Sequence, residues 1–550
     1  MIVHESRNAK FRRPFGAVEV CSPLYLSALC FGGGNVMLRL RFHTGELRII
    51  PMVSEGDNRF SLQLTTPAEP CVLWYSFQAG DEQTCEWQIT VYRHAAVPDW
   101  WKEGVVYQIF PDRFARHSDW QPREPAPRRG THRFLVNDWY TPAFYPKAEN
   151  GSVSSWPFWG GTLRGIREKL PYLQSLGITV LYLNPIFEAT SNHRYDTADY
   201  RHIDPLLGTD EDFAELCRDC RERGMRIVLD GVFNHTGADS IYFDKFGNYG
   251  TRGEYRHWFR FGKQYPNGYD SWWNVPDLPN VEESDLTYRE FICGEDGVVR
   301  HWLRAGASGW RLDVADELPD SFIREIRAAG KAEKPDALLM GEVWEDASCK
   351  ESYGQLRAYF WGEELDCTMH YPFREILLDF LLGRCDALAA CDRLWTLFEH
   401  YPRENLYAAM NLLGSHDRER IFTMLGGDRS AWKQAFLLCF ALPGVPCVYY
   451  GDEAGMTGGK DPWNRDPYPW GREDREFIAY IRGLSEFYHR HPALRSGEYE
   501  PVSFGSDVLG CRRWNADEEL LVLVNRSRRD VFAEDFGVNV PARGFVRIVK

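Results

Sequence analysis

The stretch GWRLDVADE, residues 309–317, has the apolar frame of a buried strand but carries two opposite charges. Arg311 and Asp313 are two residues apart, so on a strand their side chains point to the same face. Burying charges is costly unless they are paired and hydrogen-bonded. The pair is therefore either structural, or its face of the strand lines a site that uses it.

This stretch is one of eight short apolar runs that suit strands buried on both faces. Helical patterns separate the runs: the segment 162–177 has apolar residues at helix spacing and ends in Gly177, and Thr209 followed by Asp212 resembles a helix capping box. The eight runs are GVVYQIFP (104–111), ITVLYLNP (178–185), RIVLDGVF (226–233), SGWRLDV (308–314), LLMGEVW (338–344), LDCTMHYP (365–372), AAMNLLGSHD (408–417) and PCVYYGDE (446–453). Eight strands alternating with helices predict an α/β fold, the (β/α)8 TIM barrel.

The segments on either side of the barrel have a different pattern. Residues 1–97 run apolar or alternate at short spacing with Gly and Pro between, which predicts an N-terminal β-sandwich. The barrel is assigned to residues 98–485, and a return to the β pattern predicts a short C-terminal β-domain over 486–550. The connection after the third strand, about 236–285, is too long for an ordinary loop and is rich in aromatic residues. It predicts an inserted subdomain over the barrel mouth.

Composition excludes several classes of protein. The net charge of −15 lacks the basic footprint of a nucleic-acid binder, so no nucleic-acid partner is expected. No apolar run reaches the roughly 18 residues of a membrane span, and the N-terminal stretch lacks the apolar core of a secretory signal. The 14 scattered cysteines suit reduced thiols, which predicts a cytoplasmic protein without membrane contact. Aromatic residues, at 15%, fit either a large core or sugar binding.

Polar residues follow four of the predicted strands at their carboxyl ends, where barrel enzymes place their chemistry. They are Asp230, Asn234 and His235 on the third strand, Arg311 and Asp313 on the fourth, Glu342 on the fifth, and His416 and Asp417 on the seventh. Metal hydrolases also collect such residues, but their first strand usually ends in a His-x-His pair, and here it reads IFPDRF. Carboxylates among aromatic residues favour glycoside cleavage, in which one acid protonates the leaving oxygen and one carboxylate attacks the anomeric carbon.

Four of these stretches carry a family resemblance: DGVFNH (230–235), GWRLDVADE (309–317), GEVW (341–344) and LLGSHD (412–417). In order and spacing they resemble the signature regions of the α-amylase family of glycoside hydrolases. The flanking segments LYLNPIFEATSNHRYDTADY and GVPCVYYGDEAG are similar to those of its neopullulanase, cyclomaltodextrinase and maltogenic amylase branch. Members of that branch carry an N-terminal β-sandwich that resembles a starch-binding module, and residues 1–97 stand in the same place.

The resemblance implies a role for each strand-end residue. Asp313 is the implied nucleophile, Glu342 the general acid/base and Asp417 the third carboxylate, which grips sugar hydroxyls. Retention of configuration is also implied, with a gap of about 5–5.5 Å between nucleophile and acid. We expect Arg311 to lower the pKa of Asp313. The remaining implied substrate-site residues are Arg311, His235, His416, Tyr195, Trp344 and Asp230.

The implied reaction is retaining hydrolysis of α-1,4 bonds, with α-1,6 bonds as a second target, in maltodextrins, cyclodextrins or pullulan through a covalent glycosyl-Asp intermediate. One alternative is a transglycosidase or isomerase acting on small α-glucosides. A second is a non-catalytic glucan-binding protein on the same fold, although such proteins lack parts of the carboxylate triad that this chain keeps.

Two departures from the family pattern leave the linkage open. Asp316 stands in VADE where the branch usually has Asn, and Asp277 stands in VPDLPN where cyclodextrin-cleaving relatives have Lys. Calcium-binding relatives carry an Asn in the first-strand loop and an Asp after a Gly-Gly pair; here that Asn is missing and Thr162 replaces the Asp. We therefore expect no metal or other cofactor. A homodimer through the N-terminal domain is a further hypothesis.

Overall fold

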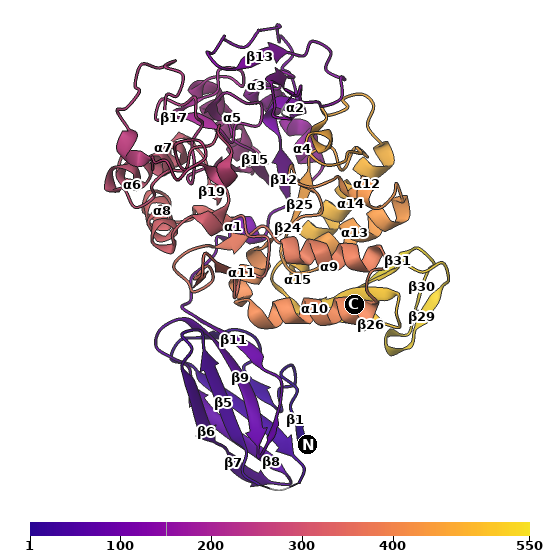
Figure 1. Ribbon diagram of the computed structural model, residues 1–550. Helices are drawn as coiled ribbons and strands as arrows, with labels where there is room; N and C mark the ends of the chain where they lie inside the picture. The colour runs from indigo at the N-terminus through magenta and orange to yellow at the C-terminus, as the bar shows by residue number, and fades with distance from the viewer. Residues whose placement is uncertain (33, 150) are drawn as a thin grey trace.

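Eight parallel strands form the barrel in the computed structural model, which describes residues 1–32, 34–149 and 151–550. They lie in the order β23-β20-β19-β18-β15-β12-β25-β24, and a parallel bridge between Met369 and Met410 joins the two ends (Figure 1). This confirms the (β/α)8 fold. The strands are β12 (Val106–Ile109), β15 (Val180–Leu183), β18 (Arg226–Gly231), β19 (Gly309–Leu312), β20 (Leu338–Gly341), β23 (Cys367–Thr368), β24 (Met410–Asn411) and β25 (Val445–Tyr449).

Helices surround the barrel with local differences from the sequence pattern. The single helix predicted over 162–177 is two short helices that meet at Lys169, because Pro171 cannot continue the first one. The capping box of Thr209 and Asp212 is confirmed at the start of α5. The helices of five or more residues are α3 (Leu163–Glu168), α4 (Leu170–Ser175), α5 (Asp210–Glu222), α6 (Leu286–Cys293), α7 (Val298–Ala305), α8 (Asp320–Glu333), α9 (Tyr371–Leu381), α10 (Ala387–His400), α11 (Arg403–Ala408), α13 (Arg429–Ala441), α14 (Arg475–Arg490) and α15 (Pro492–Ser496).

Strand β20 is not followed by a helix. Residues 342–366, all of them described, contain instead the short hairpin of β21 (Glu351–Ser352) and β22 (Gln355–Leu356). Other short strands lie in the loops at the barrel mouth: β13 (His132–Leu135), β14 (Ser155–Phe158), β16 (Phe187–Ala189) and β17 (Thr197–Ile203).

The N-terminal region consists of two packed sheets, as the alternating pattern predicts. Its apolar core includes the fully buried Leu26, Leu38, Tyr75 and Ile89. One sheet has the order β1-β4-β8-β7 with β2 beside β4, and the other has the order β3-β11-β9-β5-β6 with β10 beside β9. The strands are β1 (Ile2–Val3), β2 (Arg12–Arg13), β3 (Val18–Glu19), β4 (Pro23–Cys30), β5 (Met37–Phe42), β6 (Leu47–Pro51), β7 (Val53–Gly56), β8 (Arg59–Thr65), β9 (Cys71–Ala79), β10 (Glu82–Gln83) and β11 (Trp87–Tyr92).

The sandwich meets the barrel at α10, where the buried Arg12 guanidinium lies 2.6 Å from the Glu399 carboxylate. The C-terminal strands pack on the same side of the barrel as α13 and α14 (Figure 1). Residue 486, where the sequence pattern suggested a return to β, lies within α14. Apolar residues four, three and four apart along that helix suit a helix rather than a strand. The C-terminal strands are β26 (Glu498–Phe504), β27 (Val508–Trp514), β28 (Glu519–Asn525), β29 (Val531–Ala533), β30 (Val538–Val540) and β31 (Phe545–Val549).

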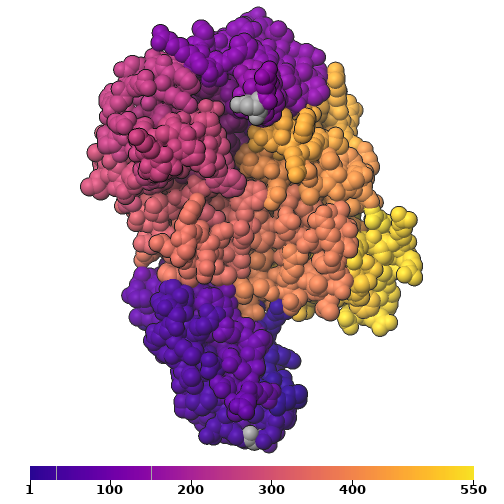
Figure 2. Space-filling model, viewed as in Figure 1, coloured from indigo at the N-terminus to yellow at the C-terminus, as the bar shows by residue number. Residues whose placement is uncertain are grey.

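The long connection after β18 covers one side of the barrel mouth. Apart from two short 3-10 turns, Arg256–Trp258 and Trp272–Asn274, its backbone is irregular. Aromatic packing holds it together; for example, the rings of Phe243 and Phe259 meet edge to face at 4.9 Å. Figure 2 shows a recess where this connection meets the loops that follow β12 and β25. Within the described residues, no helix has the length and apolar character needed to cross a membrane.

Candidate active site

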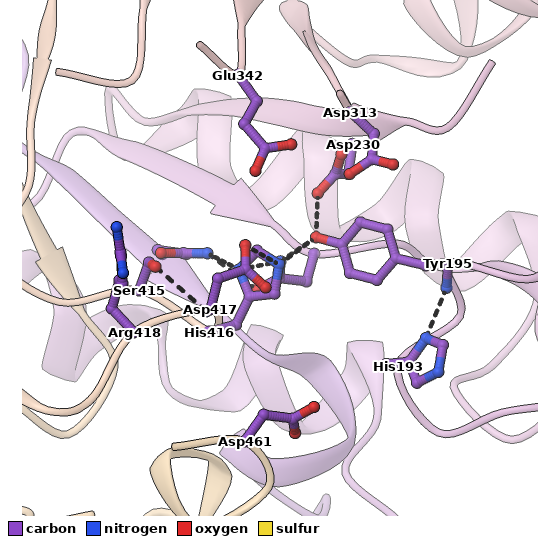
Figure 3. Close-up of polar contacts among 12 residues, drawn as sticks. His193, Tyr195, Asp230, Asp313, Glu342, Ser415, His416, Asp417, Arg418 and Asp461 are labelled. Atoms are coloured by element: carbon purple, nitrogen blue, oxygen red, sulfur yellow. Dashed lines mark hydrogen bonds and ion pairs between the residues drawn. The ribbon is translucent and has the colours of Figure 1, made fainter. Parts of the chain in front are cut away.

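A single buried guanidinium connects three of the predicted carboxylates. Nη1 of Arg311 donates hydrogen bonds to Oδ1 of Asp230 at 2.7 Å and to Oδ1 of Asp313 at 2.8 Å. Nη2 of Arg311 lies 2.8 Å from Oε2 of Glu342. Strands β18, β19 and β20 are neighbours, and their parallel register sets Asp230 beside Arg311 and Leu312 beside Gly341. We call Asp230, Asp313 and Glu342 around Arg311 the carboxylate cluster; Figure 3 shows its three carboxylates together.

Two carboxylates of the cluster, Asp230 and Asp313, bind protons more tightly than separate aspartates would. Burial raises the pKa of Asp313 well above its ordinary value; the Arg311 guanidinium opposes this shift, and the charges of Glu342 and Asp230 add to it. Arg311 does lower the pKa of Asp313, as expected, but the net shift is upward, because one cation shared among several carboxylates does not offset their burial. Coupled buried carboxylates of this kind share protons, so their titration belongs to the cluster rather than to one residue.

Glu342 is held on three sides. Oε2 accepts a hydrogen bond from the Val314 N–H at 2.9 Å, and Oε1 accepts one from Nε1 of Trp344 at 3.0 Å. Trp344 in turn stacks on Tyr371 with ring centroids 4.2 Å apart. The structure therefore places Trp344 against the proposed acid, where it fixes the carboxylate's orientation.

Val314, directly after the proposed nucleophile, has φ 42° and ψ 58°. A β-branched residue rarely adopts this left-handed conformation, and such strain concentrates at functional sites. The unusual turn brings the Val314 N–H to Glu342 and so connects the segments that carry the proposed nucleophile and the proposed acid. Nothing in the sequence signals this conformation, since Val favours extended backbone.

Tyr195, His416 and Asp417 lie next to one another beside the carboxylate cluster and form one wall of the site (Figure 3). The Tyr195 hydroxyl lies 2.6 Å from Nε2 of His416 and donates to Oδ2 of Asp230 at 2.8 Å. The Tyr195 and His416 rings are nearly parallel, with centroids 5.2 Å apart. Oδ2 of Asp417 lies 3.1 Å from Nε2 of His416, and the Asp417 side chain is 29% exposed. Burial, with the charge of Glu342 adding to it, raises the pKa of Asp417 to about 7.

Side chains that the sequence analysis did not single out determine the state of His416. Its Nδ1 lies 2.9 Å from the Gln108 amide nitrogen and 3.1 Å from that of Asn184. An amide nitrogen only donates, so Nδ1 is the acceptor and the ring proton is on Nε2. Burial holds the pKa of His416 well below its usual range, which keeps the ring neutral. Tyr182 was also missed; its hydroxyl donates to Asp230 at 2.8 Å.

His235 joins the site from the end of β18. Its Nε2 lies 3.1 Å from the Tyr195 carbonyl oxygen, and burial lowers the pKa of His235 to about 4. Nδ1 is buried and has no hydrogen-bond partner within the part of the chain that the structure describes. Because Nε2 faces a carbonyl oxygen, the ring proton lies on Nε2, and Nδ1 is a buried acceptor.

Asp316 and Asp277, the two residues that depart from the family pattern, lie in different surroundings. Asp316 points away from the cluster: Oδ1 accepts from the Tyr359 hydroxyl at 2.7 Å, and Oδ2 lies 3.2 Å from Nζ of Lys350. Asp277 is exposed, on the connection after β18. Asp316 is thus explained by local structure, while Asp277 faces solvent.

At the position where calcium-binding relatives carry an Asp, the Thr162 side chain makes hydrogen bonds within this protein. The Thr162 hydroxyl accepts a hydrogen bond from the Gly165 N–H at 2.9 Å as the N-cap of α3. Nδ1 of His117 also lies 2.9 Å from that hydroxyl. Across residues 1–32, 34–149 and 151–550, no group of three His, Cys, Asp or Glu side chains is placed to hold a metal ion.

Comparisons with known proteins show the family to which the chain belongs. Residues 108–482 match the family described as alpha amylase, catalytic domain. Over 463 residues the chain is 36% identical to a cyclomaltodextrinase of Geobacillus thermopakistaniensis (strain MAS1), covering 81% of this chain and 72% of that protein. A cyclic alpha-maltosyl-(1→6)-maltose hydrolase from Arthrobacter globiformis, solved in complex with its namesake sugar, superposes with a TM-score of 0.73 at 32% identity, covering 83% of this chain and 100% of that one. The chain belongs to the α-amylase family of glycoside hydrolases.

Some relatives are much longer proteins. The chain is 36% identical over 609 residues to an amylopullulanase of Thermoanaerobacter thermohydrosulfuricus; the match covers 92% of this chain but only 40% of that protein. The chain therefore spans less than half the length of that relative.

Proposed function

We propose that this protein hydrolyses α-glucosidic bonds of glucan oligosaccharides with retention of configuration. The observation that carries the proposal is the single buried Arg311 within 2.8 Å of both Asp313 and Glu342. The guanidinium fixes two carboxylates beside each other at the strand ends, and a retaining glycosidase needs its nucleophile and acid in such an arrangement. The predicted gap of about 5–5.5 Å between the two carboxylates stays a prediction.

The reaction has two steps. In the first, an Asp313 oxygen attacks the anomeric carbon, the bond to the glycosidic oxygen breaks, and the Glu342 proton passes to that oxygen. In the second, Glu342 takes a proton from water, which attacks the same carbon and releases Asp313. Asp417, Tyr195 and neutral His416 line the wall that would hold the sugar being transferred.

The substrates proposed are maltodextrins, cyclodextrins and pullulan, with α-1,4 bonds as the main target and α-1,6 bonds as a second. The names of the relatives support this range, since they include a cyclomaltodextrinase, an amylopullulanase and a hydrolase of a cyclic α-1,6-linked maltosyl-maltose. Transfer of the glycosyl unit to another sugar is the alternative outcome of the same intermediate.

The test is to incubate the protein with pullulan, a cyclodextrin and maltoheptaose and to resolve the products by chromatography, with Asp313→Asn in parallel. We expect cleavage of all three by the wild type and a fall of more than about 10⁴-fold in the variant. NMR of the first product formed should show the α-anomer. The pullulan product, panose, isopanose or maltotriose, identifies the linkage cut. Products longer than the substrate would favour the transglycosidase, and cleavage by Asp313→Asn at the wild-type rate would contradict the mechanism.

We further propose that the protein forms a homodimer through its N-terminal sandwich. Strands β6 and β7 are the last strands of their sheets, and Leu47, Ile49 and Val53 on them are 45%, 49% and 64% exposed. Apolar side chains on unpaired edge strands favour pairing with a second copy. Light scattering should give the mass of a dimer for the wild type and of a monomer for Ile49→Lys. A glucan-binding role for this sandwich stays a prediction.

A cytoplasmic location is proposed from the thiols. All 14 cysteines are free, and most are buried among apolar side chains rather than placed to form disulfides. Such a set of thiols suits a reducing compartment.

A further inference from the structure

A recess of about 270 Å³ in the connection after β18 is lined by three cations and by aromatic rings. The cations are Lys245, Arg252 and Arg256, and we call this recess the cation pocket. Among the described residues, no Asp or Glu side chain lines it. The other lining residues are Tyr242, Phe243, Gly253, Phe259, Phe261 and Tyr269. None of them belongs to the carboxylate cluster, so the pocket is a separate feature of the molecule.

The three cations of the pocket have no counter-ion within the part of the chain that the structure describes. A neighbouring arginine shows the usual arrangement, since Arg260 pairs with Asp270 and with Glu282, each at 2.7 Å. Unpaired cations are unexpected in a chain with 79 acidic residues against 64 Lys and Arg. Like charges gathered in one recess repel each other, so the pocket is complementary to an anionic ligand.

The carboxylates nearest in sequence do not pair with these cations. Asp244, directly before Lys245, is fully buried, and its two oxygens accept hydrogen bonds from the Tyr249 and Thr251 N–H groups at 3.1 and 3.0 Å. Glu254 is exposed and does not line the pocket. The local backbone uses one carboxylate, and solvent takes the other.

Aromatic packing fixes the positions of Arg256 and Lys245. The Arg256 guanidinium lies 3.8 Å from the centroid of the Phe261 ring, and Phe261 stacks on Phe243 with centroids 5.7 Å apart. Phe243 packs on Tyr269 at 4.7 Å, and Nζ of Lys245 donates to the Tyr269 hydroxyl at 3.0 Å. One continuous series of aromatic contacts therefore sets the two cations relative to each other.

The cations keep hydrogen-bond donors that no group in the described ranges accepts. An ammonium group has three N–H donors, and Lys245 directs two of them to the Tyr269 hydroxyl and, at 3.4 Å, to the Pro276 carbonyl oxygen. Stacking uses the face of the Arg256 guanidinium and leaves its N–H edge free, and the exposed Arg252 adds a further set of donors. A phosphate monoester has three strong acceptor oxygens and a charge of about −1.5 to −2 at pH 7, which matches these donors.

We propose that the cation pocket binds a phosphorylated hexose. Arg252, Arg256 and Lys245 hold the phosphate, and an aromatic ring of the wall packs on the apolar face of the sugar. The volume of about 270 Å³ lies just below the range of about 300–1,000 Å³ for drug-sized ligands, which suits one sugar unit. This inference goes beyond the proposed function and does not depend on it. Such a group occurs on a free hexose phosphate and on a phosphorylated glucan, and the test distinguishes the two.

Isothermal titration calorimetry of the full chain with glucose 6-phosphate, inorganic phosphate and glucose tests the pocket. We expect glucose 6-phosphate to bind at one site, inorganic phosphate to bind more weakly, and glucose to give no measurable binding there. In Arg252→Gln/Arg256→Gln, the Kd of glucose 6-phosphate should rise about 10- to 100-fold, because charge-assisted hydrogen bonds to the phosphate are lost. Arg252→Lys/Arg256→Lys keeps the charges and should restore part of the affinity. Arg528→Gln/Arg529→Gln, which removes two exposed arginines from the C-terminal region, is the matched control and should bind like wild type.

Three results overturn the proposal: no binding of glucose 6-phosphate, an affinity that the glutamine substitutions leave unchanged, or an equal loss in the control. Equal affinity for inorganic phosphate and glucose 6-phosphate rejects the assignment to a phosphorylated hexose. Thermal unfolding shows whether each variant is folded, and Lys245→Met provides the same test if the arginine variant is not.

A maltodextrin that carries 6-phosphate groups separates the two sources of the ligand. Tighter binding than that of glucose 6-phosphate identifies a phosphorylated glucan, and weaker binding identifies the free hexose phosphate. None of these readouts depends on cleavage of a glycosidic bond, so failure of the proposed function and failure of the cation pocket are distinguishable.

Discussion

The carboxylate cluster and the cation pocket arrange their charges in opposite ways. In the cluster, one fully buried cation, Arg311, is shared by three carboxylates, whereas the pocket gathers three cations that form no ion pair within the described residues. The cluster lies at the ends of three hydrogen-bonded strands, while the pocket lies on the irregular connection after β18.

This difference follows from what each part has to do. Shifting the pKa of a carboxylate and stabilising a developing charge require burial and fixed partners, which neighbouring parallel strands supply. Binding a free anion requires cations whose donors stay unpaired until the ligand arrives, and an irregular surface connection can leave them so.

The largest effect is expected from Glu342→Gln. On maltoheptaose, kcat should fall about 10²- to 10⁴-fold, because the leaving oxygen loses its proton donor. On 4-nitrophenyl α-maltoside the fall should be smaller, since nitrophenolate leaves without full protonation. Steady-state kinetics on both substrates measures this. Glu351→Gln changes an exposed carboxylate in the connection after β20 and should leave both rates nearly unaffected; losses of equal size for the two variants would mean that Glu342 is not the proton donor.

The next effect concerns stability. Arg311→Met should lower the free energy of unfolding by about 3–5 kcal/mol at pH 7, because three buried carboxylates lose their cation. The loss should be smaller at pH 5. Burial raises the pKa of Asp230 and Asp313 in the folded state, so protonation relieves the unpaired charge at acidic pH, and this relief is lost as pH rises.

Urea denaturation at both pH values measures this loss. Arg41→Met is the matched control, because Arg41 pairs with Glu86 at 2.6 Å on the exposed surface, where an ion pair contributes under about 1 kcal/mol. Equal losses for the two variants would mean that Arg311 is not the electrostatic centre of the cluster.

The contrast between buried strand ends and irregular loops also explains which parts of the structure could be predicted from the sequence. The apolar runs predicted all eight barrel strands. Because the carboxyl ends of barrel strands lie at one face, the sequence also predicted that Asp230, Asp313 and Glu342 lie close together, as they do around Arg311. The sequence predicted less well where partners come from distant segments. Gln108 and Asn184 beside His416 depend on the register of β12, β15 and β24, which apolar spacing does not specify.

The sequence pattern also did not predict the residues with left-handed backbone conformation. Val314, Trp273 and Tyr353 all have positive φ, which their side chains disfavour, so local propensity indicates the wrong conformation at each. The tertiary structure imposes these turns. The net upward shift of the Asp313 pKa was also not predicted, because burial is not visible in a two-residue spacing.

A smaller effect is expected from the pH dependence of Asp417. Burial and the Glu342 charge raise the pKa of Asp417 to about 7, against about 3.9 in an unfolded chain. The folded state therefore binds this proton more tightly, and the stability that it contributes is full below about pH 4 and is lost as pH rises through 7. Asn cannot ionise, so Asp417→Asn should become more stable relative to wild type by about 1–3 kcal/mol between pH 5 and pH 8.

Urea denaturation at the two pH values checks this prediction. Asp81→Asn, on the exposed turn between β9 and β10, is the control and should show no such dependence. If the stability difference between Asp417→Asn and wild type is the same at both pH values, Asp417 does not share the electrostatic environment of the cluster.

The smallest effect is expected from removal of divalent cations. In calcium-dependent relatives, the ion is held by oxygens of an Asn and an Asp in the first-strand loop and of an Asp after the Gly-Gly pair. Here the Thr162 hydroxyl caps α3 and contacts His117, and the Asp119 carboxylate accepts a hydrogen bond from Arg164 at 2.9 Å. These oxygens already have protein partners, so EDTA should change neither the melting temperature nor kcat on maltoheptaose. A loss of both that added calcium restores, but magnesium does not, would show that backbone carbonyls complete a calcium site. The loops would then depend on a bound ion, while the strand-end cluster depends on Arg311 alone.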